Sequence, residues 1–164
     1  MTDKAATTQV YRIVIKATAQ AIWDAITKPE WTKRYGYGGG VEYQLKAGGR
    51  YCHRASPEMK AGGLPDVIIV GEVIESDPPR KLVQTWHPLF NEATTVETPT
   101  RLTYEITEHP AGVCTVTLTH EVQGAPLVAR MVQGGGDPTR GGGGWPWILS
   151  DLKSLLETGE RMPT

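Results

Sequence analysis

The sequence predicts an α+β fold in which an antiparallel sheet of about six or seven strands packs against one long C-terminal helix. Most of residues 9–122 falls into short segments in which apolar and polar residues alternate, the pattern of half-buried strands. The connections between these segments are too short for the crossovers of a parallel sheet. Residues 146–158 differ, because their apolar residues recur at helical spacing and form one wide stripe that must be buried against another element. With 164 residues, the chain is expected to form one domain, 1–164, around one core.

The first elements are expected to be a strand and two short helices. Residues 9–16 alternate with a period of two, which predicts the first strand. Thr18 can cap a short helix that ends before Pro29. Pro29 can itself open another helical turn, which carries Trp31 and Tyr35.

Two hairpins are expected to follow. Residues 41–45 and 50–55 flank a Lys-Ala-Gly-Gly turn and read as the first hairpin, and residues 56–65 read as a loop. Residues 67–75 and 81–87 read as the second hairpin, around a turn whose two prolines exclude both helix and ladder hydrogen bonds.

A polar connector then leads to a third hairpin, made of residues 101–108 and 113–122. When these two strands are paired about their turn, one face is expected to be buried and the other, rich in threonine, to be wet. The buried face comprises Leu102, Tyr104, Ile106, Cys114, Val116, Leu118 and His120.

The N-terminal segment and the C-terminal third of the chain are expected to differ in how well ordered they are. Residues 1–8 are expected to be disordered, and residues 125–133 to form one or two helical turns. Residues 134–144 hold two glycine runs, whose backbone entropy predicts a flexible loop. The helix of residues 146–158 has a proline in its first turn and Gly159 just past its end, which are the residues favoured at these places.

Composition disfavours several partners and compartments. The formal net charge is −1 and 21% of the residues are charged, so no electrostatic field draws nucleic acid or an anionic membrane. No leader and no apolar run long enough to cross a membrane are found, and the chain is expected in the cytoplasm. Cys52 and Cys114 are expected to be reduced core thiols. The sequence leaves open whether the protein forms a homodimer.

Four segments of the chain resemble the corresponding segments of one known family. They are, from the N-terminus onward, Gly48-Gly49-Arg50-Tyr51, Gly71 to Trp86, Leu118-Thr119-His120-Glu121 and Gly144 to Gly159. Together they resemble the heat-shock ATPase activator homologue family of the START-like (SRPBCC, birch-pollen-allergen-like) helix-grip superfamily. This resemblance implies a strongly curved antiparallel sheet that grips the C-terminal helix, with a cavity between them closed by the two short helices. Members include lipid and hormone binders, aromatases and cyclases, and co-chaperone domains, so fold alone does not select a function.

The first functional hypothesis is binding of a small, largely apolar molecule, aromatic or lipid-like, in that cavity, without a cofactor or a metal. Apolar walls with a few polar groups are typical of small-molecule sites. His53 and Gln84 stand where the family favours aromatic residues, which makes them candidate polar contacts. The strand pattern predicts these cavity residues: Trp31, Tyr35, Tyr51, His53, Gln84, Trp86, Tyr104, His120 and Trp145.

The second hypothesis is a cofactor-free cyclase, dehydratase or hydrolase that uses His53 or His120 with Tyr104 or Glu72 for proton transfer. The alternative is that the ring nitrogens of either histidine form hydrogen bonds only with neighbouring protein atoms and take no part in a reaction. The direction of Glu72 depends on the register of its hairpin: a turn with three unpaired residues points Glu72 inward, whereas four unpaired residues point Val73 inward. The outward position of Glu72 is favoured, because valine is the better core residue.

The third hypothesis is a protein-interaction role in which the domain modulates a chaperone ATPase, as the family resemblance implies. The outward threonine-rich surface is ordinary sheet surface, and 164 residues leave no room for the second domain of a true co-chaperone. A chaperone partner is therefore disfavoured. Metal and nucleotide sites are not expected, because the histidines and cysteines lack ligand spacing and residues 134–144 lack a phosphate-loop motif.

Overall fold

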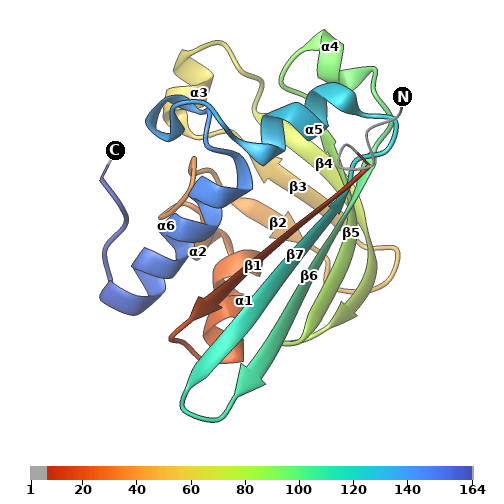
Figure 1. The fold of residues 1–164 in the computed structure, drawn as a ribbon. Helices are drawn as coiled ribbons and strands as arrows, with labels where there is room; N and C mark the ends of the chain where they lie inside the picture. The colour runs from red at the N-terminus through yellow and green to blue at the C-terminus, as the bar shows by residue number, and fades with distance from the viewer. Residues whose placement is uncertain (1–6, 164) are drawn as a thin grey trace.

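The computed structural model describes residues 7–163, and these form a seven-stranded antiparallel sheet in the order β1-β7-β6-β5-β4-β3-β2. Figure 1 shows the sheet curving around the space beside the C-terminal helix α6. The predicted α+β fold class is confirmed. The strands are β1 Thr8–Ile15, β2 Val41–Tyr43, β3 Arg50–Arg54, β4 Val67–Asp77, β5 Lys81–Pro88, β6 Thr100–His109 and β7 Val113–Glu121. The helices are α1 Ala19–Thr27, α2 Pro29–Thr32, α3 Pro57–Ala61, α4 Glu92–Thr95, α5 Pro126–Gln133, a 3₁₀ turn at Pro138–Arg140, and α6 Gly144–Thr158.

Local signals at several helix ends behave as the sequence predicts. The Thr18 hydroxyl accepts a hydrogen bond from the Ala21 N–H at the start of α1, 3.1 Å away. Gly159 ends α6 in the left-handed conformation, with φ of 81°. Residues 1–6 of the segment expected to be disordered lie outside the described residues, and Thr8 already pairs with Glu121.

Two segments that were expected to lack helices contain short ones. The loop predicted for residues 56–65 contains α3, and that expectation was wrong. Ser56 caps α3 by accepting from the Met59 N–H, and Pro57 occupies its first turn. The polar connector before β6 likewise contains α4, capped by the Asn91 side chain.

The pairing of β6 with β7 places the predicted face toward the core. Tyr104 lies opposite Leu118, and Leu102 lies opposite His120. The remaining members of this face are buried between the sheet and α6, whereas Thr115 and Thr117 on the other face are partly accessible. The alternation of the sequence therefore gives the correct register for this hairpin.

The hairpin of β4 and β5 contains a β-bulge that settles the direction of Glu72. Asp77 pairs with Lys81 beside the turn, but a register shift between Val73 and Glu75 then places Val73 opposite Gln84. Val73 is fully buried and Glu72 is exposed. The favoured outward position of Glu72 matches the structure.

Helix α6 contacts the C-terminal end of the open edge of β1 as well as the inside of the sheet. The Lys153 ammonium donates to the Val14 carbonyl over 2.6 Å, and the Lys16 N–H donates to the Glu157 carboxylate over 2.8 Å. Lys153 and Glu157 also form an ion pair with each other. The side chains of one helical turn thus satisfy backbone groups at a sheet edge.

The segment after α6 is fastened to the loop that follows α2. Asp151 is completely buried, and its carboxylate accepts hydrogen bonds from the Gly36 N–H, the Arg161 guanidinium and the Met162 N–H at 2.8, 3.0 and 2.6 Å. Arg161 also donates to the Gly36 carbonyl. These contacts hold the loop at Gly36 against α6. Between residues 7 and 163, no helix is long and apolar enough to cross a membrane.

Candidate functional site

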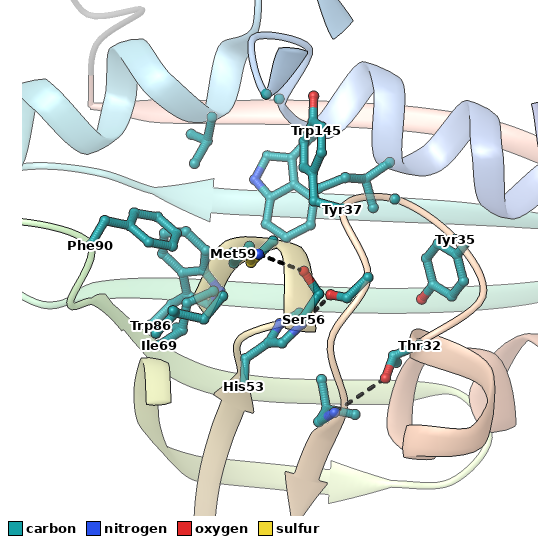
Figure 2. Close-up of a pocket in the computed structure, with 18 of the residues that line it drawn as sticks. Thr32, Tyr35, Tyr37, His53, Ser56, Met59, Ile69, Trp86, Phe90 and Trp145 are labelled. Atoms are coloured by element: carbon teal, nitrogen blue, oxygen red, sulfur yellow. Dashed lines mark hydrogen bonds between the residues drawn. The ribbon is translucent and has the colours of Figure 1, made fainter. Parts of the chain in front are cut away.

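A cavity of about 460 Å³ lies between the inner face of the sheet and the first turn of α6. Its walls come from β2 to β6, from α3 and α5, and from the loops around residues 36–38 and 141–144. Figure 2 shows Trp86, Phe90 and Met59 at one side of this space, with Trp145 above them and Tyr35 at the other side. The volume falls within the range of about 300–1,000 Å³ that is usual for small-molecule sites.

Most of the predicted site residues meet in this cavity. Six of the nine line it, and these are Tyr35, Tyr51, His53, Trp86, Tyr104 and Trp145. Gln84 and His120 are fully buried and support the wall from outside the cavity. Trp31 does not line it, and its ring lies instead under the Arg34 guanidinium at 4.7 Å. The role of these residues in binding stays a prediction.

His120 belongs to a buried chain of hydrogen bonds that is complete within the protein. The Trp145 indole N–H donates to His120 Nδ1 over 3.0 Å, which leaves the ring proton on Nε2. His120 Nε2 lies 2.8 Å from the Thr100 hydroxyl, which in turn donates to the Trp86 carbonyl over 2.7 Å. Burial lowers the pKa of His120 to about 4, so the ring is neutral at pH 7. This geometry makes His120 a support for Trp145.

His53 is held by the loop that closes one end of the cavity. Its Nε2 lies 2.9 Å from the Gly38 carbonyl oxygen and donates to it in the corresponding tautomer. Burial lowers the pKa of His53, and hydrogen bonds with the Gly38 and Gly39 backbone oppose this effect in part. Gly39 is required for this approach, because its φ is 83° and a Cβ there would lie 2.1 Å from the Arg54 carbonyl oxygen.

Four tyrosines line the inner part of the cavity, and the hydroxyls of two of them donate to neighbouring residues. The Tyr43 hydroxyl donates to Gln84 Oε1 over 2.6 Å, and the Tyr35 hydroxyl donates to the Ala25 carbonyl over 2.9 Å. The rings of Tyr43 and Tyr51 lie 4.7 Å apart. Burial raises the pKa of all four phenols, the fourth being Tyr104, so they are neutral hydrogen-bonding groups at pH 7.

The acid/base pair considered for the enzymatic hypothesis does not form. Glu72 points away from the cavity. His53 bonds to the Gly38 carbonyl, and His120 bonds to the Thr100 hydroxyl and the Trp145 indole. Neither imidazole has a carboxylate among its hydrogen-bond partners. Within residues 7–163, no cluster of three or more His, Cys, Asp or Glu side chains is arranged to hold a metal ion.

The glycine-rich segment of residues 134–144 covers one side of the cavity and is held there by Tyr37. The Tyr37 hydroxyl donates to the Pro138 carbonyl over 3.0 Å and accepts from the Gly143 N–H over 2.8 Å. Gly141 and Gly144 contribute to the cavity wall. The flexibility expected for this segment stays a prediction.

Several cavity residues were not singled out from the sequence. Tyr43 could have been found, because it pairs with Tyr51 and therefore shares its face of the hairpin. Met59 and Phe90 come from the segments around α3 and α4, whose positions relative to the sheet carry no local signal. Tyr37 belongs to an irregular loop and could not have been placed by periodicity.

Comparison with known proteins yields one matching family and many similar folds. A family model described as Activator of Hsp90 ATPase homolog 1-like protein matches residues 16–157. No curated protein matches the chain.

Similar solved structures include the Aha1 dimer from Colwellia psychrerythraea, with 19% sequence identity, coverage of 93% of this chain and 97% of that chain, and a TM-score of 0.62. An HSP90 activator from Plasmodium falciparum shares 21% identity over 70% of this chain and 72% of that chain, with a TM-score of 0.53. CalU16 from Micromonospora echinospora shares 18% identity with a TM-score of 0.51, and the match covers 69% of this chain but only 59% of CalU16. At these identities the similarity shows the fold.

Proposed function

The chain belongs to the family of Activator of Hsp90 ATPase homolog 1-like proteins, and we propose that it acts by binding a small, largely apolar molecule between the sheet and α6. The single observation that carries this proposal is the cavity of about 460 Å³. The apolar walls of such a space are unfavourable to leave against water, because burial of apolar surface is worth roughly 25 cal/mol per Å². A bound molecule recovers part of that cost.

The chemistry of the walls supports an aromatic or lipid-like occupant. Trp86 and Trp145 present flat apolar faces, with ring centroids 6.1 Å apart, and Met59 and Met131 add flexible side chains. His53 on the wall and His120 behind it have no carboxylate among their hydrogen-bond partners, so we propose binding without chemistry. The free thiols of Cys52 and Cys114 support our further proposal of a reducing, cytoplasmic location.

A ligand panel tests this proposal directly. Flat apolar compounds are titrated into the protein while tryptophan fluorescence and Tm are recorded, and a bound compound is expected to quench the fluorescence and raise Tm. Met59→Trp fills the cavity from α3, where the side chain is only partly buried, and is expected to weaken binding at least tenfold. Leu127→Trp, which adds the same bulk at an exposed position outside the cavity, serves as the control. Equal binding by both variants argues against the cavity as the site.

A second candidate function is contact with a chaperone ATPase, which the family description favours. The outer side of β1 offers one feature for it, because Val10 and Val14 are about half exposed there, at 48% and 50%. Replacement of both valines by threonine is expected to abolish capture of a purified Hsp90 if this surface is used. Light scattering of the same samples tests whether the protein forms a homodimer.

A further inference from the structure

Among residues 7–163, the cavity wall carries no side chain that is cationic at pH 7, because burial lowers the pKa of the histidine that lines it, His53. No lysine or arginine is among the described residues that line it. The one formally charged lining residue is Glu58, which is exposed on α3. The N-terminus of α6 borders the cavity at Gly144, and Pro146 removes one of the backbone N–H donors that such a terminus can offer an anion. A carboxylate moved into this space would lose its hydration without gaining a counter-charge, which is strongly unfavourable.

The wall carries several polar groups, and one of them, the Tyr104 hydroxyl, is available to a ligand. The Tyr104 hydroxyl forms no hydrogen bond with any described residue, in contrast to the bonded hydroxyls of Tyr35 and Tyr43. Tyr104 belongs to the inner face of β6 and remains partly accessible, and its oxygen is not among the buried unsatisfied atoms. Its accessible surface therefore faces the cavity. Since burial raises its pKa, the phenol there is neutral and can both donate and accept.

Flat apolar surfaces lie beside this hydroxyl. The Trp145 ring meets the Tyr104 ring edge to face, with centroids 6.4 Å apart and an interplanar angle of 87°. Trp86 lies next to Trp145 on the same side of the cavity. A planar molecule against these indoles would bring an oxygen at its rim within reach of Tyr104.

From these observations we infer that the cavity selects neutral molecules, with a flat apolar body and one hydroxyl or carbonyl oxygen bound by Tyr104, and rejects carboxylates and other anions. This inference rests on the proposed function. Within this class of neutral ligands, Tyr104 is the residue that distinguishes a molecule with a hydroxyl or carbonyl oxygen from one without. Fatty acids in their ionised form are excluded by the same argument, whereas phenols and aromatic ketones are included.

Calorimetric titration with naphthalene, 2-naphthol and 2-naphthoate at pH 7 tests the inference. These three probes share one ring system and differ in having no oxygen, a neutral hydroxyl or a charged carboxylate. 2-Naphthoate is expected to bind at least tenfold more weakly than 2-naphthol. Tyr104→Phe is expected to lower the affinity for 2-naphthol relative to naphthalene roughly 2- to 10-fold, the usual effect of one neutral hydrogen bond.

Tyr11→Phe is the matched control, because Tyr11 lies outside the cavity wall and its hydroxyl donates to Gln9. It is expected to leave the ratio of the two affinities unchanged. The inference is overturned if 2-naphthoate binds as tightly as 2-naphthol, or if Tyr104→Phe weakens all three probes equally. If neither naphthalene nor 2-naphthol binds, the proposed function itself fails, and the inference falls with it.

Discussion

Acidification is expected to destabilise the protein through His120. The imidazole is inaccessible to solvent and bonded at both nitrogens, and burial lowers its pKa from 6.5 to about 4. In the unfolded chain the ring takes up a proton below about pH 6.5, whereas in the folded chain it does so only below about 4. The unfolded state therefore binds more protons in this interval, and stability falls as the pH drops through it.

The size of the effect follows from the width of that interval. Each pH unit between the two pKa values corresponds to about 1.4 kcal/mol, so His120 accounts for a loss of roughly 3 kcal/mol between pH 6.5 and pH 4. This is a large part of the 5–15 kcal/mol that is typical for a domain. Well above pH 6.5, where the ring is neutral in both states, the same histidine contributes no pH dependence.

Urea denaturation at several pH values between 4 and 7.5 measures this loss, for the parent protein and for His120→Gln. The glutamine keeps a donor toward Thr100 but does not titrate. The variant is therefore expected to be less stable than the parent protein at pH 7, and its stability is expected to fall less steeply as the pH is lowered. Carboxylates such as Glu42 and Asp66, whose pKa values are lowered by ion pairs and hydrogen bonds, titrate in both proteins and cancel in the difference. Parallel stability curves for the two proteins would refute the reasoning, as would an imidazole resonance of His120 that titrates near pH 6.5.

Three further substitutions have definite expected outcomes. Tyr37→Phe removes both hydrogen bonds that the Tyr37 hydroxyl forms with the 134–144 segment. Faster amide exchange at Gly143 and faster ligand association are expected, because the segment is then held less tightly. Unchanged amide exchange would contradict this role of Tyr37. Gly39→Ala is expected to cost more than about 2 kcal/mol in urea denaturation, because its Cβ meets the Arg54 carbonyl, whereas Gly63→Ala, with a similar positive φ but open surroundings, costs about 1. Asp151→Asn removes the negative charge that pairs with Arg161, and it is expected to lower the free energy of unfolding by about 1–3 kcal/mol. The segment after Gly159 is then held less firmly, so proteolysis there is expected to be faster. An unchanged cleavage rate would contradict the role of Asp151 in holding this segment.

Much of the fold could be predicted because its signals are local. The cap at Thr18, the left-handed Gly159 and the alternation of β6 and β7 each depend on a few neighbouring residues. Helix α3 has local signals too, at Ser56 and Pro57, but its five residues are too few for an apolar periodicity to show.

The candidate site was only partly predictable, because its details depend on residues far apart in the chain. The partners of His120 are Thr100 and Trp145, 20 and 25 positions away, and no pattern in the sequence links the three. Strand parity placed Tyr51 and Tyr104 on the inner face, but the free volume beside them depends on how far α6 lies from the sheet. The bulge beside Val73 likewise shifts the register by one residue without a glycine or proline to mark it.

The contacts of Lys153 and Glu157 with the border of β1 limit how two copies of the chain can join. In an antiparallel strand, alternate residues direct their backbone groups away from the neighbouring strand, and Val14 and Lys16 are such residues here. Because α6 already occupies these two groups, a second molecule cannot pair its own strand with the C-terminal end of β1 unless the helix is first displaced. The same helix that shapes the interior thus also protects this end of the edge strand from pairing with another chain.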